Sequence, residues 1–151
     1  MDKLIYFDYA ATTPVRPEAV EAMVDALGQF GNPSSRYGYA RQAAQQVKEG
    51  RETAAAAVGC SPAELFFTSC GTESDNWALR RGVELNRRRG KHIVTTAIEH
   101  AAVLETCKDL ERQGYEVTYL KPDRAGRIGA GQLAAALRPD TALVSMMLVN
   151  N

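Results

Sequence analysis

The sequence predicts an α/β protein in which an N-terminal helical segment is followed by part of a mostly parallel sheet sandwiched by helices. Two patterns support this prediction. Apolar positions within residues 17–58 recur at the period of a helix, whereas short apolar runs alternate with helical patterns after residue 61. Strands and helices that alternate with short connections require right-handed crossovers and therefore a parallel sheet. We expect an N-terminal arm with helices at residues 1–60 and the first part of a sheet domain at residues 61–151.

The overall composition favours a globular protein that binds a small molecule. Of the 151 residues, 45% are hydrophobic and 24% are charged, and 18 basic side chains balance 18 acidic ones. A chain with no net formal charge has no overall field to attract nucleic acid or an anionic membrane. No run approaches the ~20 apolar residues of a membrane span, and the N-terminus does not read as a signal peptide. Three widely spaced cysteines are typical of free thiols, so we expect a cytoplasmic protein.

The first sixty residues contain two predicted helices. The first follows Pro17, which suits the first turn of a helix, and it carries four apolar residues at the spacing i, i+3, i+4 and i+7. These residues are Val20, Met23, Val24 and Leu27. Residues 31–35, with the sequence GNPSS, predict a loop. The second helix is expected from about residue 39 to residue 58, and its small inward residues predict close packing against another helix.

The remainder of the chain contains four predicted strands and three predicted helices. The strands are expected at residues 65–68, 92–96, 116–120 and 141–149. The helices are expected at residues 72–89, 101–113 and 131–137. Gly90 and Gly114 stand where the first two of these helices should end. The last strand is nearly continuous in apolar residues, which is typical of a strand covered on both faces.

Three segments follow predicted strands and should reach the carboxyl edge of the sheet, where parallel sheets bind their ligands. The first is the turn at residues 69–72. We expect Thr72 to cap the next helix together with Asp75, and Gly71 to let the backbone approach a ligand closely. The first-turn N–H groups and the helix dipole would then bind an anion, above all a phosphate. The pattern is neither a P-loop nor GxGxxG, so an ordinary capped turn remains the alternative.

The other two segments contribute His100 and Asn151. His100 follows a strand and precedes a helix, where an imidazole can stack on an aromatic cofactor ring or transfer protons. The alternative is a histidine that only caps the helix. Asn151 follows the last strand, so its amide should point into the same crevice. The other histidine, His92, begins a strand beside Lys91, and we expect it to be structural.

The chain also contains an ordered series of motifs. They are FDYAATTP at residues 7–14, GNPSS at 31–35, FTSCGTESDN at 67–76, EHAAVL at 99–104, GYEVTYL at 114–120, and VSM at 144–146 leading to VNN at 149–151. In this order and spacing the motifs resemble those of the cysteine desulfurases of the NifS/IscS type, which are class V aminotransferases of PLP fold-type I. The resemblance covers all 151 residues. It implies an incomplete fold-type I large domain and pyridoxal 5'-phosphate as the cofactor.

The resemblance implies a role for each candidate residue. Gly71 and Thr72 match the positions that hold the cofactor phosphate. His100 matches the histidine that stacks over the pyridine ring and serves catalysis as a proton carrier. Asn151 matches the asparagine near the cofactor O3' and the substrate carboxylate. No metal site is expected.

The family converts L-cysteine to L-alanine and passes the sulfur to an enzyme persulfide for iron–sulfur cluster or thio-cofactor assembly. The resemblance therefore implies L-cysteine as the substrate, a homodimer, and a sulfur-acceptor or scaffold protein as partner, with no role for nucleic acid or a membrane. The family's cofactor-bonding lysine and persulfide cysteine lie beyond Asn151, so we expect an N-terminal portion that is inactive alone. Cys70 stands where many relatives have glycine, and we expect it to be a small packing residue. A selenocysteine lyase, another class V relative or a non-catalytic fragment remains the alternative.

Overall fold

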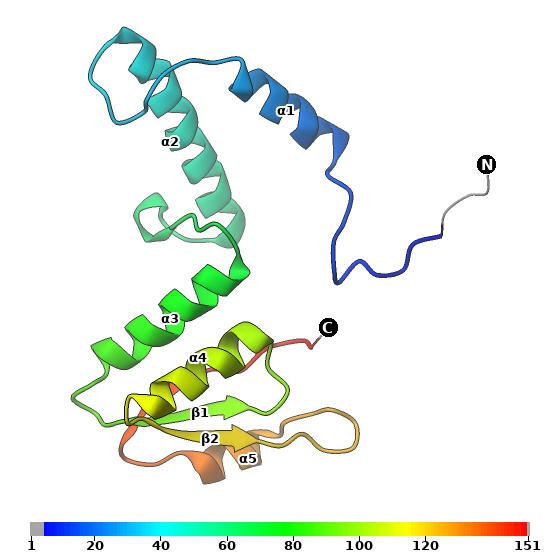
Figure 1. The fold of residues 1–151 in the computed structure, drawn as a ribbon, viewed down its shortest axis with the longest axis vertical. Coiled ribbons are helices and arrows are strands. Elements are labelled where there is room, and N and C mark those ends of the chain that lie inside the picture. The colour runs from blue at the N-terminus through cyan, green and yellow to red at the C-terminus, as the bar shows by residue number, and fades with distance from the viewer. Residues whose placement is uncertain (1–4, 151) are drawn as a thin grey trace. The chain divides into compact units, whose positions relative to one another are not determined.

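The computed structural model describes residues 5–150, which form five α-helices, one short 3-10 helix and a three-stranded sheet (Figure 1). The chain divides into two compact units, Met1–Phe67 and Thr68–Asn151. The first unit is helical, and the second combines helices with a parallel sheet. The predicted α/β class is therefore confirmed. Among the described helices, none has the length and apolar character needed to cross a membrane.

In the first unit, α1 (Pro17–Leu27) and α2 (Gly38–Val58) form where helices were predicted. The apolar stripe of α1 is exposed, and none of its residues is buried among the described residues. α2 buries only Ala40 and Ala55, and within this unit it contacts the short 3-10 helix η1 (Pro62–Glu64). The close packing against another helix that was predicted for α2 is limited, within the described part of this unit, to its contact with η1.

Residues 65–68 form no strand in the described chain, so that prediction was wrong. A strand needs a neighbouring ladder for its backbone groups, and the Leu65 carbonyl instead accepts a hydrogen bond from the Arg51 guanidinium. The same guanidinium lies 5.0 Å from the ring centroid of Phe67. Phe66 and Phe67 are 64% and 61% exposed. A short apolar run therefore does not show by itself that a segment has a neighbouring strand with which to pair.

The second unit is built around β1 (His92–Thr96), which lies between β2 (Glu116–Leu120) and β3 (Thr141–Val144). Both neighbours run parallel to β1, and His92 pairs with Glu116 on one side and with Thr141 on the other. The parallel sheet predicted from the alternating pattern is therefore confirmed.

The third strand ends at Val144 rather than at residue 149. Its last link to β1 is the hydrogen bond from the Ser145 N–H to the Val94 carbonyl, at 2.9 Å. The chain then leaves the sheet, and Leu148 is 98% exposed. The prediction of a long strand covered on both faces was wrong for residues 145–149, because the apolar run continues past the end of the backbone ladder.

Three helices accompany the sheet (Figure 1). α3 (Gly71–Leu85) and α4 (Ala101–Arg112) pack on one face of it, and α5 (Ala130–Ala136) contacts β2. α3 ends four residues earlier than the predicted residue 89, because the Asn86 amide donates to the Gly82 carbonyl at 2.9 Å and closes the last turn.

The core of the second unit lies between the sheet and the pair α3 and α4. Its buried apolar side chains are Leu79, Val83, Ile93, Val103, Cys107 and Leu110. Thr95 shares the face of Ile93, because side chains alternate along a strand. Thr95 is fully buried, and its hydroxyl has no hydrogen-bond partner among the described residues.

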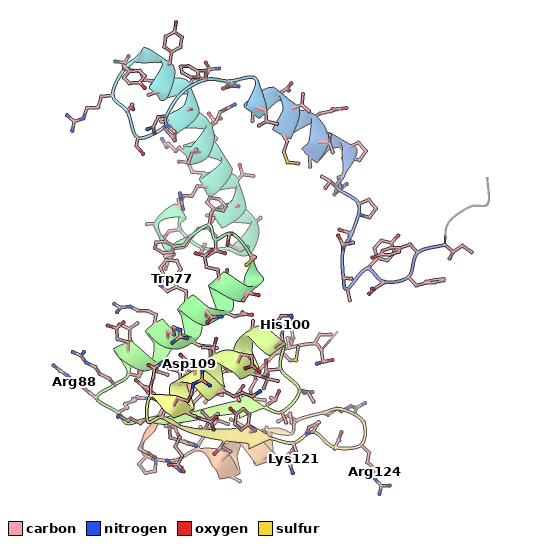
Figure 2. All side chains as sticks on the ribbon, in the orientation of Figure 1. Trp77, Arg88, His100, Asp109, Lys121 and Arg124 are labelled. Carbon is pink, nitrogen blue, oxygen red and sulfur yellow. The ribbon has the colours of Figure 1, made fainter. Side chains whose placement is uncertain are left out.

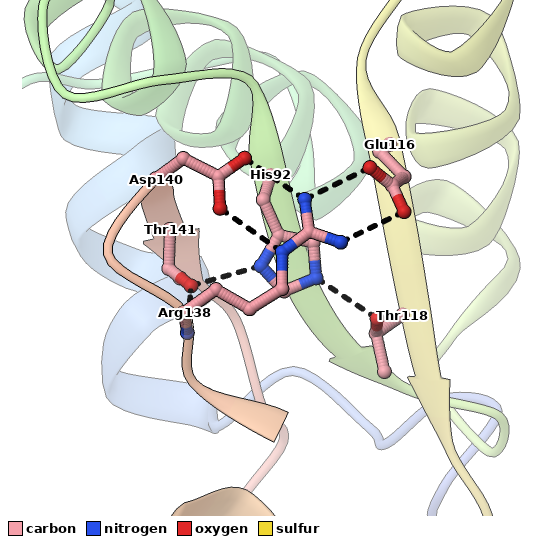
Figure 3. A network of polar contacts seen from close by, with 6 residues as sticks. All are labelled: His92, Glu116, Thr118, Arg138, Asp140 and Thr141. Carbon is pink, nitrogen blue, oxygen red and sulfur yellow. Dashed lines mark hydrogen bonds and ion pairs between the residues drawn. The ribbon is translucent and has the colours of Figure 1, made fainter. Parts of the chain in front are cut away.

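His92 holds the amino ends of the three strands together (Figure 3). Its imidazole is fully buried, with Nδ1 at 2.8 Å from the Thr141 hydroxyl and Nε2 at 2.8 Å from the Thr118 hydroxyl. Burial, and then the nearby Arg138 charge, lower the pKa of His92. A neutral ring with both nitrogens bonded serves the structure, as predicted for this residue.

Arg138 extends this contact to the surface of the molecule (Figure 3). Its guanidinium donates two hydrogen bonds to the Glu116 carboxylate, both at 2.8 Å, and further bonds to Asp140 at 3.0 and 2.8 Å. These hydrogen bonds lower the pKa of both carboxyl groups. We call the six residues of Figure 3 the amino-end clamp, because they join all three strands at the edge opposite the candidate site.

Candidate cofactor site

The turn predicted to bind phosphate leads into α3, whose first residue is Gly71. Thr72 is therefore the second residue of the helix, and the cap predicted for Thr72 with Asp75 was wrong. The reason is the Glu73 carboxylate, which accepts hydrogen bonds from the N–H and from the hydroxyl of Ser69, both at 2.7 Å. These bonds close the turn before Thr72 can cap it.

The start of α3 offers an open position for an anion. A Cβ atom built on Gly71 would meet no atom of another segment within 4 Å. The Thr72 hydroxyl makes no hydrogen bond to a described residue. The backbone N–H of Glu73, followed by the Ser69 hydroxyl, lowers the pKa of the Cys70 thiol. N–H groups that stabilise a thiolate also suit a phosphate oxygen.

Cys70 itself differs from its predicted role. It is the N-cap residue of α3 and is exposed, rather than a small packing residue. The N–H groups of Glu73 and Thr72 both lower the pKa of the Cys70 thiol, although its side chain makes no capping hydrogen bond. The thiol and an incoming phosphate would therefore use the same donors.

His100 is the N-cap residue of α4 and is exposed. Its Nδ1 accepts a hydrogen bond from the Ala102 N–H at 3.1 Å. An accepting Nδ1 carries no proton, so the proton of the neutral ring lies on Nε2. The capping role considered from the sequence is therefore correct, and Nδ1 fills it. The Nε2–H group takes no part in the cap.

Thr72 and His100 line one groove between α3 and α4, with a volume of about 490 Å³. Each stands at the start of its helix, and Figure 2 shows His100 at that end of α4, with Asp109 further along the same helix. The structure therefore brings together two of the three segments that were expected to converge.

The other end of the groove is lined by paired charges. The Asp109 carboxylate accepts hydrogen bonds from Arg80 at 2.8 Å and from Arg112 at 2.9 Å. The bond from Arg80, followed by that from Arg112, lowers the pKa of Asp109. Both guanidinium groups are engaged by the Asp109 carboxylate, whereas the Thr72 hydroxyl at the start of α3 makes no hydrogen bond to a described residue.

The segment after β3 reaches the turn before His100. The Asn150 amide donates to the Ile98 carbonyl at 2.6 Å. Asn150 lines a second hollow of about 440 Å³, together with the loop at residues 126–128, and not the groove of Thr72. Asn151 lies outside the described residues, so its role as a cofactor ligand stays a prediction.

Sequence reasoning missed Glu99, which lies directly before His100. Glu99 is only 7% exposed. Its Oε1 accepts hydrogen bonds from the Thr96 hydroxyl at 2.7 Å and from the Met147 N–H at 2.8 Å. The available signal was a single acidic residue at the end of an otherwise apolar and threonine-rich strand segment.

The groove offers anion-binding and proton-transfer groups, and its described lining includes no lysine. The described lysines are Lys48, Lys91, Lys108 and Lys121, and all lie elsewhere. Within residues 5–150, no group of three or more His, Cys, Asp or Glu side chains is arranged to hold a metal ion. These residues fit the phosphate and ring of an organic cofactor, but a covalent bond to it requires a residue from elsewhere.

Residues 5–151 match the family described as Aminotransferase class-V. The cysteine desulfurase IscS of Methanosarcina thermophila is 49% identical over 151 residues, which are 99% of this chain and 37% of that protein. The protein of the same name from Salmonella paratyphi B is 50% identical, over 97% of this chain and 37% of its own length. This chain therefore spans about 37% of the length of these curated relatives.

Solved structures show the same similarity. A NifS-like protein superposes with a TM-score of 0.91 at 41% identity, over 97% of this chain and 40% of that one. SspA in complex with cysteine superposes with a TM-score of 0.84 at 40% identity, over 96% of this chain and 42% of that one.

Proposed function

Because this chain belongs to the class-V aminotransferase family, we propose that the protein that carries it is a cysteine desulfurase dependent on pyridoxal 5'-phosphate. One observation carries the proposal: Thr72 and His100 stand at the starts of α3 and α4 and line one groove, in a chain about 50% identical to cysteine desulfurases. L-cysteine would give L-alanine and an enzyme persulfide. Its C–S bond breaks, an S–S bond forms to an enzyme thiol, and the carbon takes up a proton.

The residues of the groove have separate tasks in this proposal. When bound, pyridoxal phosphate supplies an electron sink for negative charge at the substrate carbon. Gly71 and Thr72 would hold its phosphate through backbone N–H groups, the helix dipole and the Thr72 hydroxyl. His100 would contact the pyridine ring and move a proton through Nε2, since Nδ1 is engaged at the helix cap. Asn151 would bind near the cofactor O3' and the substrate carboxylate.

The proposal extends to substrate and partners. A structural neighbour has been solved with cysteine bound, which supports L-cysteine as the substrate. A role in iron–sulfur cluster assembly agrees with the names of the relatives. The proposal adds a homodimer and transfer of the sulfur to an acceptor or scaffold protein for iron–sulfur cluster or thio-cofactor assembly. Cys60, Cys70 and Cys107 form no disulfide, which supports a reducing compartment such as the cytoplasm.

The activity can be tested on the full-length protein that carries this chain, purified with pyridoxal phosphate. We expect alanine and, with a thiol reductant, sulfide from L-cysteine in equal amounts. A selenocysteine lyase would release alanine from L-selenocysteine and little from L-cysteine. A cofactor-loaded protein that gives alanine from neither substrate would contradict the proposal and favour a non-catalytic relative.

Variants of Thr72 and His100 test the site. Thr72→Ala removes one hydrogen bond to a charged phosphate, which is worth about 1.5–3 kcal/mol, so the affinity for pyridoxal phosphate should fall about tenfold or more. His100→Ala should lower kcat by roughly 10²–10⁴-fold, as expected for a lost proton carrier. Arg124 is exposed in a distant loop, so Arg124→Ala is the matched control. Equal affinity and kcat in all variants would remove these residues from the site.

A chemical readout of the phosphate position needs no activity. Because a phosphate and the Cys70 thiolate would share the N–H groups of Thr72 and Glu73, inorganic phosphate or pyridoxal phosphate should slow alkylation of Cys70 by iodoacetamide. Mass spectrometry of the Cys70 peptide measures the rate, and the partly buried Cys60 serves as the internal control. Identical Cys70 rates with and without both anions would place the phosphate elsewhere.

A further inference from the structure

Glu99 is a buried carboxylate that no basic side chain neutralises within the described residues. It is 7% exposed, and the ion pairs of residues 5–150 do not include it. Burying a carboxyl group is costly unless hydrogen bonds to protein groups replace those to water. In Glu99, one oxygen, Oε1, accepts both of these hydrogen bonds, from the Thr96 hydroxyl and from the Met147 N–H. The carboxylate therefore fixes these two donors relative to one another.

The two donors belong to different segments of the chain. Thr96 is the last residue of β1, whereas Met147 lies three residues beyond the end of β3. The backbone ladder between these strands ends with the bond from Ser145 to Val94. The Glu99 carboxylate thus continues the connection beyond the ladder, where no backbone carbonyl of β1 pairs with Met147.

A second bond joins the same segments one step further along. The Asn150 amide donates to the carbonyl of Ile98, the residue before Glu99. Two hydrogen bonds therefore link the turn at residues 97–100 to the segment at residues 145–150. One is accepted by the Glu99 carboxyl group, and the other is donated by the Asn150 amide. His100 follows immediately, and its ring is oriented by the bond from Ala102.

We propose that Glu99 is a positioning residue, which locks the turn before α4 to the segment after β3 and so sets the separation between His100 and Asn150. The catalytic part of this inference rests on the proposed function, in which His100 and Asn151 contact one cofactor. A displacement of about 1 Å at a reacting group can cost on the order of 100-fold in rate. A rigid link between the two segments therefore bears directly on turnover, although Glu99 contacts neither cofactor nor substrate in the proposal.

The proposed link between the two segments can be tested without catalysis, by amide hydrogen exchange of the full-length protein. Glu99→Ala should raise exchange at residues 97–102 and at residues 145–150 together, by about tenfold or more, while β2 keeps its protection. Glu99→Gln retains an acceptor oxygen and should restore most of the protection in both segments. Glu84→Gln on the exposed surface of α3 is the matched control. If either segment keeps wild-type protection in Glu99→Ala, Glu99 does not link them.

The proposed effect of Glu99 on catalysis can be tested by measuring kcat, KM and the visible circular dichroism of the bound cofactor. Glu99→Ala should lower kcat by roughly 10- to 100-fold with a small change in KM, and should alter the cofactor dichroism, with recovery in Glu99→Gln. Loss of thermal stability with wild-type kcat and dichroism in the folded fraction would show a merely structural role. Should Glu99→Ala fail to fold, Thr96→Val removes one of the two donors at nearly constant volume, and wild-type exchange, kcat and dichroism in that variant would overturn the inference.

The two proposals can fail separately. If the wild-type protein binds pyridoxal phosphate but releases no alanine from L-cysteine, the proposed function fails, and exchange and dichroism still decide the role of Glu99. If the wild-type protein is active and Glu99→Ala is as well ordered and as active, only the role of Glu99 fails.

Discussion

The unpartnered hydroxyl of Thr95 predicts a substitution that should stabilise the protein. Thr95 is fully buried, and its Oγ1 has no hydrogen-bond partner among the described residues. Burying a hydroxyl in this way costs about 1–3 kcal/mol. Thr95→Val keeps the β-branched shape of a strand residue and replaces the hydroxyl with a methyl group, whose burial adds up to about 0.8 kcal/mol. We expect an increase of about 1–2 kcal/mol in the free energy of unfolding.

Thr106→Val provides the matched control for this change. Thr106 is also buried, but its hydroxyl donates to the Ala102 carbonyl at 2.8 Å. The loss of a satisfied bond costs about 0.5–1.5 kcal/mol, which the added methyl group offsets only in part. The same chemical substitution should therefore stabilise the protein at residue 95 and leave it unchanged or weaker at residue 106.

Urea unfolding of the full-length protein, followed by circular dichroism, compares the two variants with the wild type. The dependence on urea concentration should stay constant, so that the shift in midpoint reports stability. A destabilised Thr95→Val variant, with a midpoint as low as that of Thr106→Val, would refute the reasoning. It would show that the Thr95 hydroxyl has a favourable partner.

Three further predictions follow from burial. The free energy of unfolding should fall below about pH 6.5, because the lowered pKa of buried His92 means that the unfolded chain binds the proton more readily. Urea titrations between pH 7.5 and 5.5 should show this dependence of stability on pH. An unchanged dependence in His92→Gln would contradict the prediction. Burial raises the pKa of Cys107 to about 11, so iodoacetamide should label Cys70 in the native protein but Cys107 only in urea. Labelling of Cys107 in the native protein would contradict its burial. Leu110→Ala should cost about 2–5 kcal/mol and Leu85→Ala less than about 0.5 kcal/mol, since these side chains are 2% and 66% exposed; equal urea midpoints would contradict the core assignment.

The sequence predicted the elements whose signals are local. β1 and β2 match their predicted bounds because each is a short apolar run between helical patterns. The run at residues 65–68 has the same appearance but forms no strand, because pairing depends on a neighbour that a local pattern does not reveal. β3 was predicted too long for a related reason: its ladder ends at Ser145, although the apolar run continues.

The site was predicted in outline and not in detail. Thr72 and His100 line one groove because they stand at the starts of α3 and α4, two helices that pack against each other. The cap at Thr72 was wrong, because the competing bonds of Glu73 to Ser69 depend on rotamers that the sequence does not specify. Glu99 was missed because its partner Met147 is 48 residues away.

The amino-end clamp also bears on the order in which the sheet assembles. The imidazole of His92 bonds to Thr118, 26 residues away, and to Thr141, 49 residues away. Closing the shorter loop costs less chain entropy, so we expect β2 to join β1 first while water still occupies the Nδ1 side of the ring. Docking of β3 should then bring the Thr141 hydroxyl to Nδ1 and complete the contact. We therefore expect the third strand to dock on a pair of strands that has already formed, with the Thr141 hydroxyl opposite Nδ1 of His92 helping to set its register.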